Sequence, residues 1–180
     1  MNASRLALML GLLSWPLQPM DDAVRDWMRT NQSPGTRRMM EVVSSKSRAV
    51  LVAGAVIGLV TGRAGRMCLI ETVIALAPVN VAVEGLKWTV NRERPDGDRN
   101  RKNSSFPSSH AANAFAVAFV VGRRYDRAAI ALLLAALLVA FSRMYLDRHW
   151  ASDVIGSLLL AWGGAWLAGR AMAWWGSRKS

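Results

Sequence analysis

The feature that most constrains this chain is a series of apolar segments joined by short, mostly basic connectors. The segments span residues 49–62, 67–86, 111–122, 128–141 and 154–173. Several are shorter than the roughly 20 residues that cross a bilayer core, and reach that length only with their polar flanks. Polar helix ends are tolerated in a membrane where they face a shared cavity. The pattern therefore favours an all-α, multi-pass transmembrane bundle over a soluble bundle with buried helices.

A further apolar stretch, residues 6–17, follows Arg5 near the start of the chain. It could be the core of a signal peptide or a first membrane helix. No small-residue cleavage pattern follows it, which favours an uncleaved anchor. With this stretch the bundle has about six helices, with both chain ends on one side of the membrane.

The polar stretch 21–47 is expected to lie at the membrane surface. Asp21 or Asp22 could cap a short helix that ends at Ser33, Pro34 and Gly35, and a second short amphipathic helix is expected at residues 39–43. We therefore expect two parts: an anchor helix with an interfacial segment in residues 1–48, and a catalytic helical domain in residues 49–176.

Composition narrows the possible partners of the chain. The net charge is +11 and 52% of the residues are apolar. Nucleic acid, an anionic membrane surface or a phosphorylated substrate could each explain this charge. The arginines lie in short gaps between apolar segments and not along one helical face, so nucleic acid is the weakest candidate. Several tryptophans lie near the ends of apolar segments, as is typical of a membrane interface: Trp15, Trp88, Trp150, Trp174 and Trp175.

The connectors also predict an orientation. Basic residues lie in two short connectors and at the C-terminal end, and the positive-inside rule places these in the cytoplasm. They are Arg63 and Arg66, then Arg123, Arg124 and Arg127, then Arg170, Arg178 and Lys179. The longer polar loops 87–109 and 143–152 then face the exterior. Because these loops are also basic, their charges need another explanation.

Both histidines of the chain fall in or next to these longer loops. Histidine suits proton and group transfer near neutral pH. If the last helix begins near Trp150, His149 and Asp153 lie one turn apart on one face. The carboxylate could then orient the imidazole as a nucleophile. An aspartate that merely caps the helix is the alternative, and the spacing alone does not decide between the two.

The same loops supply cations that suit a phosphoryl group. Lys87, Arg94 and Arg143 could neutralise the charge on its oxygens. Ser108 and Ser109 follow Pro107 at an expected helix start, where backbone N–H groups can bind an anion. Each arginine taken singly could instead contact anionic lipid headgroups.

Taken together, these residues resemble the three-part signature of the type 2 phosphatidic acid phosphatase (PAP2) superfamily. The parts are Lys87-x6-Arg94-Pro95, then Pro107-Ser108-Ser109-His110, then Ser142-Arg143-x5-His149-x3-Asp153. They occur in the family's order and with its internal spacings, within residues 84–156.

The resemblance implies a fold like that of the acid phosphatases and haloperoxidases, and a metal-free and cofactor-free reaction. His149 would attack phosphorus and form a phosphohistidine, Asp153 would orient it, and His110 would act as general acid. Lys87, Arg94 and Arg143 would bind phosphate, with help from the remaining site residues, Ser108 and Ser109. The family usually has glycine at position 109, which leaves the rate and the substrate of this chain open.

The expected activity is that of a lipid phosphatase in a bacterial-type inner membrane, with its active site facing the periplasm. Candidate substrates are undecaprenyl diphosphate, phosphatidylglycerol phosphate, phosphatidate and lipid A. A vanadate-dependent haloperoxidase and a soluble acid phosphatase of the same superfamily are alternatives, as is a membrane protein whose basic loops only bind lipid. The sequence does not specify the oligomeric state.

Overall fold

The computed structural model describes residues 15–60, 62–100 and 103–178. Most of the predicted anchor helix lies outside them. The described residues are mainly helical, with short turns at 31–33 and 123–125 and longer loops at 91–108 (without residues 101 and 102) and 146–150. The helices are η1 (Trp15–Leu17), α2 (Gln18–Thr30), α3 (Pro34–Val60), α4 (Gly62–Val90), α5 (Ser109–Gly122), α6 (Asp126–Tyr145) and α7 (Ala151–Ser177).

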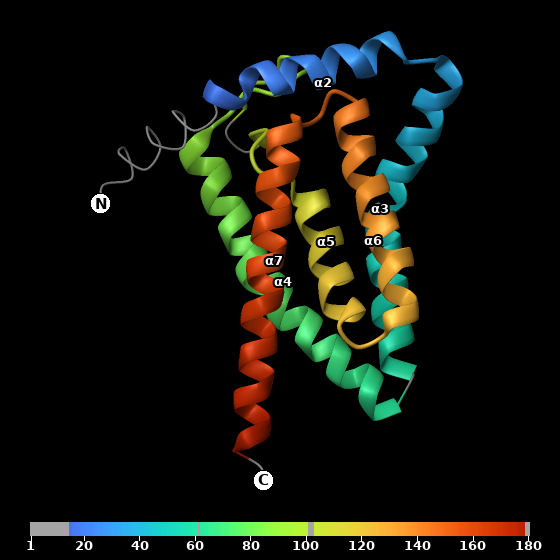
Figure 1. Cartoon of the computed structure of the whole chain (residues 1–180), viewed down its shortest axis with the longest axis vertical. Coiled ribbons are helices and arrows are strands. Elements are labelled where there is room, and N and C mark those ends of the chain that lie inside the picture. Colours follow the sequence, from blue (N-terminus) through green and yellow to red (C-terminus); the bar gives the residue numbers. More distant parts are fainter. Residues whose placement is uncertain (1–14, 61, 101–102, 179–180) are drawn as a thin grey trace.

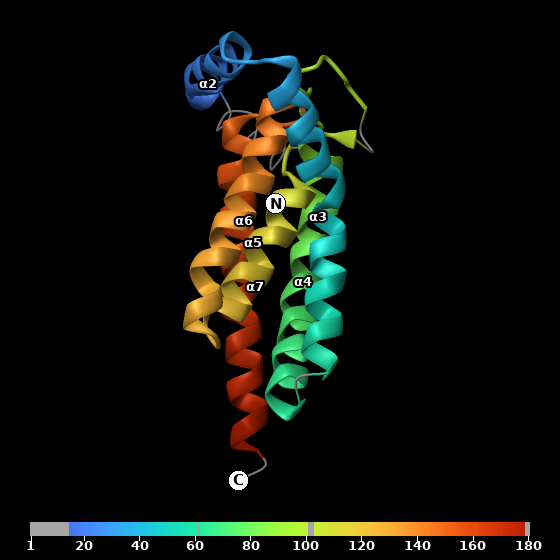
Figure 2. The same cartoon turned by 90° about the vertical axis from the view of Figure 1, so that its right-hand side faces the viewer.

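Helices α3 to α7 run alternately in opposite directions along the long axis of the molecule (Figure 1). Helix α2 lies across one end of this bundle, roughly perpendicular to it (Figures 1 and 2). The six α-helices, and the absence of strands from the described residues, confirm the predicted all-α bundle.

The bundle places small side chains inside and large apolar side chains outside. Its core is rich in buried alanines, among them Ala111, Ala116, Ala140 and Ala165. Many large apolar side chains on α4, α6 and α7 are exposed: Val73, Val81, Ile130, Leu134, Leu137, Leu159, Trp162 and Trp166. Such a surface would be unfavourable in water but suits lipid, and small residues allow membrane helices to approach closely.

Among the described residues, three helical segments are long and apolar enough to cross a membrane: Gly62–Val90, Ala128–Tyr145 and Ala151–Ser177. Helix α5 is apolar but has only 14 residues. At about 1.5 Å per residue it spans only about two thirds of a hydrocarbon core. It packs against α4, α6 and α7, and its N-terminal end stops below the end of the bundle that α2 covers (Figure 1). Helix α5 is thus shorter than its neighbours at that end of the bundle.

The two sets of connectors lie at opposite ends of the bundle, as the basic residues predict. The end of α3, the start of α4, the turn between α5 and α6 and the end of α7 lie at one end (Figure 1). Loops 91–108 and 146–150 share the other end with α2.

Two details of the N-terminal region differ from the prediction. Helix α2 begins at Gln18, so Asp21 lies inside its first turn and is buried; its carboxylate does not cap the helix. The predicted short helix at residues 39–43 is part of α3, which continues to Val60. The proposed boundary between residues 48 and 49 therefore falls within one helix. The break before Pro34 is present as predicted, and proline at a first helical position is favourable.

Close packing of α4 against α7 depends on Gly164. A Cβ at this position would lie 2.3 Å from Val79 Cγ2 and 3.0 Å from the Ala75 carbonyl oxygen. At the neighbouring Gly163, a Cβ would meet nothing within 4 Å.

We therefore expect Gly164→Val to lower the thermal midpoint in detergent, because overpacking costs roughly 1–3 kcal/mol. Gly163→Val makes the same change one residue away and should alter the midpoint much less. Equal midpoints for the two variants would contradict the packing described here.

Candidate active site

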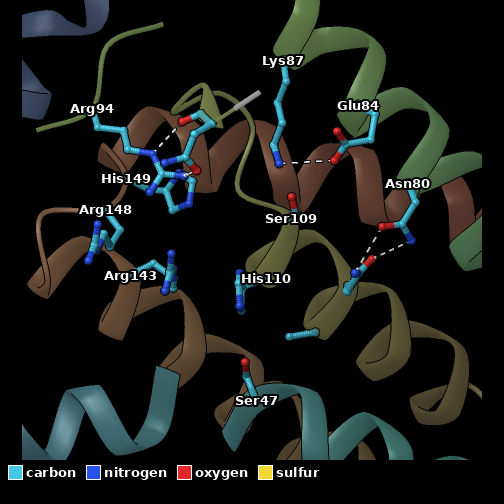
Figure 3. A pocket seen from close by; sticks show the side chains of 13 residues that line it. Ser47, Asn80, Glu84, Lys87, Arg94, Ser109, His110, Arg143, Arg148 and His149 are labelled. Carbon is cyan, nitrogen blue, oxygen red and sulfur yellow. Dashed lines mark hydrogen bonds and ion pairs between the residues drawn. The ribbon is translucent and has the colours of Figure 1, made fainter. Parts of the chain in front are cut away.

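A cavity of about 560 Å³ lies above the N-terminal end of α5. Six predicted site residues line it: Lys87, Arg94, Ser109, His110, Arg143 and His149. They come from the end of α4, loop 91–108, the start of α5, the end of α6 and loop 146–150. Figure 3 shows Lys87 reaching in from α4, His110 from α5, and Arg143 and His149 from the opposite side. The fold thus brings residues from the three separate motifs to one cavity.

His149 is buried, with 3% of its surface exposed. Its Nδ1 lies 2.6 Å from the carbonyl oxygen of Ser105, so the ring donates there through Nδ1–H. The Nε2 atom then carries the lone pair, which is the form that a nucleophile requires. Burial lowers the pKa of His149 below its ordinary value, the nearby Asp153 opposes this shift, and Arg143 and Arg94 add to it. The ring is therefore neutral at pH 7.

The orienting hydrogen bond comes from a different partner than predicted. The nearest oxygen of Asp153 lies 3.8 Å from Nδ1, which is an ion-pair distance and too long for a hydrogen bond. Its Oδ2 atom instead accepts from Ser105 Oγ at 2.5 Å and from the Trp150 backbone N–H at 2.8 Å. Asp153 therefore caps α7. It also binds Ser105, whose carbonyl oxygen accepts from His149, so its contact with the histidine is indirect.

Two of the cavity's arginines are held in place by hydrogen bonds to neighbouring residues. Arg94 donates through Nε to the Asn103 carbonyl oxygen at 2.8 Å and through Nη2 to Asn103 Oδ1 at 2.6 Å. Arg143 donates to Ser44 Oγ on α3 at 2.6 Å. These hydrogen bonds hold the two guanidinium groups at the cavity wall, where arginine can bind an oxyanion through charge-assisted hydrogen bonds. Lys87 pairs with Glu84 at 3.3 Å across one turn of α4.

The structure places the two serines differently. Ser109 is the first residue of α5 and lines the cavity. Ser108 is fully buried beside it, and its backbone N–H donates to Ser157 Oγ on α7 at 2.8 Å. That N–H group is therefore occupied within the protein. The role predicted for Ser108 as a phosphate donor has no geometric support from its backbone.

Several residues of the site were not predicted. Arg148 lines the cavity next to His149 and pairs with Asp96 at 3.1 Å. Asn80 and Asn113 form an amide pair on another side of the cavity, joined at 3.0 and 3.3 Å (Figure 3). Ser105 binds His149 from loop 91–108. No spacing rule links Ser105 to His149, 44 residues away, so the sequence could not predict this contact. Arg148 could have been predicted as a site residue, because it directly precedes the candidate nucleophile.

The lining suits an anion better than a metal ion. Its charged groups are Lys87, Arg94, Arg143 and Arg148, with Glu84 as the carboxylate. Within the described part of the chain, no group of three or more His, Cys, Asp and Glu side chains could hold a metal. Positive charge in a cavity with low-dielectric walls attracts anions strongly.

Comparison with known proteins gives one family and four similar proteins. The model of the PAP2 superfamily matches residues 66–177. A lipid A 1-phosphatase of Porphyromonas gingivalis is 35% identical over 95 residues, which cover 51% of this chain and 20% of that protein. The undecaprenyl-diphosphatase BcrC of Bacillus subtilis is 36% identical over 59 residues, which cover 33% of this chain and 31% of that protein. The matched segments thus span less than a third of each relative's length.

Two solved structures share the fold. The crystal structure of Aquifex aeolicus LpxE superposes with a TM-score of 0.73 and 20% identity, covering 82% of this chain and 93% of that one. A transmembrane PAP2-type phosphatidylglycerolphosphate phosphatase from Bacillus subtilis superposes with a TM-score of 0.70 and 19% identity, covering 96% and 97%. Both alignments take in most of the two bundles.

The cavity should bind orthovanadate, an oxyanion that resembles a phosphoryl group in transfer. We expect vanadate to raise the thermal midpoint of the wild-type protein. At a vanadate concentration of 100 times its Kd, binding adds about 2.7 kcal/mol to the free energy of unfolding. Arg143→Gln should abolish most of this increase because it removes a charge from the cavity wall.

Arg99→Gln is the matched control. Arg99 pairs with Glu93 and is 71% exposed, so its loss removes the same charge away from the cavity. Equal vanadate stabilisation of Arg143→Gln and Arg99→Gln would show that the anion binds elsewhere.

Proposed function

The chain belongs to the PAP2 superfamily, and we propose that it is an integral membrane phosphatase that cleaves phosphate from a lipid through a phosphohistidine on His149. The observation that carries this proposal is the buried, neutral His149 facing a cavity lined by fixed cations. A lone pair on Nε2, opposite a phosphorus atom whose oxygens contact arginine and lysine, is arranged for in-line attack.

In the first step, Nε2 of His149 forms a bond to phosphorus as the bond from phosphorus to the leaving oxygen breaks. His110 lines the same cavity and donates a proton to that oxygen. The leaving group departs as an alcohol, or as a phosphate monoester when the substrate is a diphosphate. His149 retains its Nδ1 proton on the Ser105 carbonyl, and the nearby Asp153 stabilises the positive ring.

In the second step, water attacks phosphorus and the N–P bond breaks. His110 is now neutral and accepts a proton from the water. Inorganic phosphate leaves, and His149 and His110 return to their starting protonation states. Lys87, Arg94 and Arg143 stabilise the charge on the phosphoryl oxygens in both steps.

A lipid substrate is supported by the outer surface of the bundle. The exposed Leu, Ile and Trp side chains favour embedding in a bilayer over a soluble acid phosphatase. A membrane-embedded site with a polar cavity at one end admits a phosphorylated headgroup while the acyl or isoprenoid chains stay in lipid. The names of the relatives support lipid A and undecaprenyl diphosphate among the candidates, beside phosphatidylglycerol phosphate and phosphatidate.

The location follows from the orientation of the bundle. The cavity lies at the end opposite the short basic turns. If those turns face the cytoplasm, the site opens to the exterior of a bacterial-type inner membrane.

The test is a phosphate-release assay with the purified protein in mixed micelles. The panel contains lipid A, undecaprenyl diphosphate, phosphatidylglycerol phosphate and phosphatidate, and each lipid is assayed without EDTA, with EDTA, and with EDTA followed by excess Mg²⁺. We expect release from at least one lipid, and a loss of at least about a thousandfold in His149→Ala, because removal of a nucleophile leaves only residual catalysis. Arg99→Gln, with its exposed side chain, should retain the wild-type rate.

Two results would contradict the proposal. Unchanged release by His149→Ala would exclude the phosphohistidine route. A rate that is lost in EDTA and restored by Mg²⁺ would exclude the metal-independent reaction.

A further inference from the structure

Behind His149, the carboxylate of Asp153 belongs to a buried cluster of three charges. Arg92 donates through Nη1 to Asp153 Oδ1 and through Nη2 to Asp21 Oδ2, both at 2.7 Å. The side chain of Arg92 is 11% exposed, and those of the two aspartates are fully buried. In loop 91–108, Arg92 therefore bridges two carboxylates that are 132 residues apart in the chain.

Each member of the cluster is fixed by further contacts. Asp21 accepts from the Ser152 backbone N–H at 2.8 Å and from Ser152 Oγ at 2.5 Å. Arg92 also donates to Ser152 Oγ at 2.6 Å, and its guanidinium lies 5.4 Å from the centroid of the Trp150 ring. Helix α2 thus reaches the first turn of α7, next to the nucleophile, through Asp21.

We propose that Arg92 and Asp21 position and electrostatically tune the Asp153–His149 pair, which makes helix α2 part of the active site. The inference rests on the proposed role of His149. Arg92 does not line the 560 Å³ cavity, so it acts through Asp153 and not by binding the phosphate. Asp21 partly neutralises the Arg92 guanidinium and so weakens the electrostatic effect of Arg92 on Asp153.

Charge counting gives the cluster a defined effect. With two carboxylates and one guanidinium, its net charge is −1. This charge stabilises the positive ring of a phosphohistidine. Loss of Arg92 changes the net charge to −2, and loss of the Asp21 charge changes it to zero.

Other charges also face His149 and stay in place in both variants. Across the cavity these are Glu84, Lys87, Arg94, His110, Arg143 and Arg148. On the side of α2, Arg25 joins Asp21 in a small cavity that also touches His149. Because these charges are the same in both variants, the change in the charge of the cluster determines whether the pH midpoint of His149 rises or falls.

The experiment follows the protonation of His149 directly. The chain has only two histidines, so histidine-selective isotope labelling of the tag-free protein in detergent gives two NMR signals, which His110→Ala assigns. We expect Arg92→Gln to raise the pH midpoint of His149 by about one unit and Asp21→Asn to lower it by about one unit. Arg99→Gln should leave it unchanged.

The same variants are then assayed for phosphate release. Arg92→Gln should lower kcat by about 10- to 100-fold, as loss of a partner that orients a histidine does at metal sites, with KM nearly constant. The acidic limb of the kcat/KM profile, which requires neutral His149, should move to higher pH in Arg92→Gln and to lower pH in Asp21→Asn. Arg92→Lys keeps the charge and should restore the position of the limb.

Unchanged NMR midpoints, or shifts of equal sign in the two variants, would overturn the inference, because a merely structural role predicts no opposite shifts. This outcome is distinct from failure of the proposed function. If the wild-type protein released no phosphate from any lipid, the NMR midpoints would still decide whether Arg92 and Asp21 tune His149.

Discussion

The site depends on one buried carboxylate, that of Asp153 at the start of α7. Its oxygens accept from Arg92, from Ser105 and from the Trp150 backbone, and so join loop 91–108 to the segment that carries His149. An isolated buried carboxylate would be strongly unfavourable, so the burial of Asp153 depends on these contacts. The position of the His149 ring follows from them, because Ser105 supplies both a hydroxyl to Asp153 and a carbonyl to His149.

The bundle provides the space that this arrangement needs. Alanines and Gly164 bring the helices close together, while large apolar side chains face outward. Inside, the short helix α5 ends before it reaches the end of the bundle covered by α2, and the vacant volume is lined by polar residues from its neighbours. Small side chains inside and large apolar side chains outside suit the bundle to a membrane, and the short helix α5 lies below the polar cavity at one end.

Much of this could be predicted from the sequence, because the relevant signals are local. Apolar segments located the helices, and the fixed spacings around Lys87, His110 and His149 identified the residues that the structure brings to one cavity. The partners that fix those residues could not be predicted. Ser105 meets His149, and Asp21 meets Ser152 131 residues away, only through the packing of α2 and loop 91–108 onto α7. The sequence predicts a short helix at residues 39–43 and a separate apolar segment from residue 49, whereas both belong to helix α3. The change from polar to apolar residues within this one helix resembles a boundary in the sequence.

If His149 is the nucleophile, its covalent intermediate can be trapped. The protein is mixed with a phosphate-labelled lipid substrate, quenched in alkali within the first turnover and digested for mass spectrometry. We expect an acid-labile, alkali-stable phosphoryl group on the peptide that contains His149, and its absence from His149→Ala. Turnover without any phosphorylated enzyme, or a label on another residue, would contradict it.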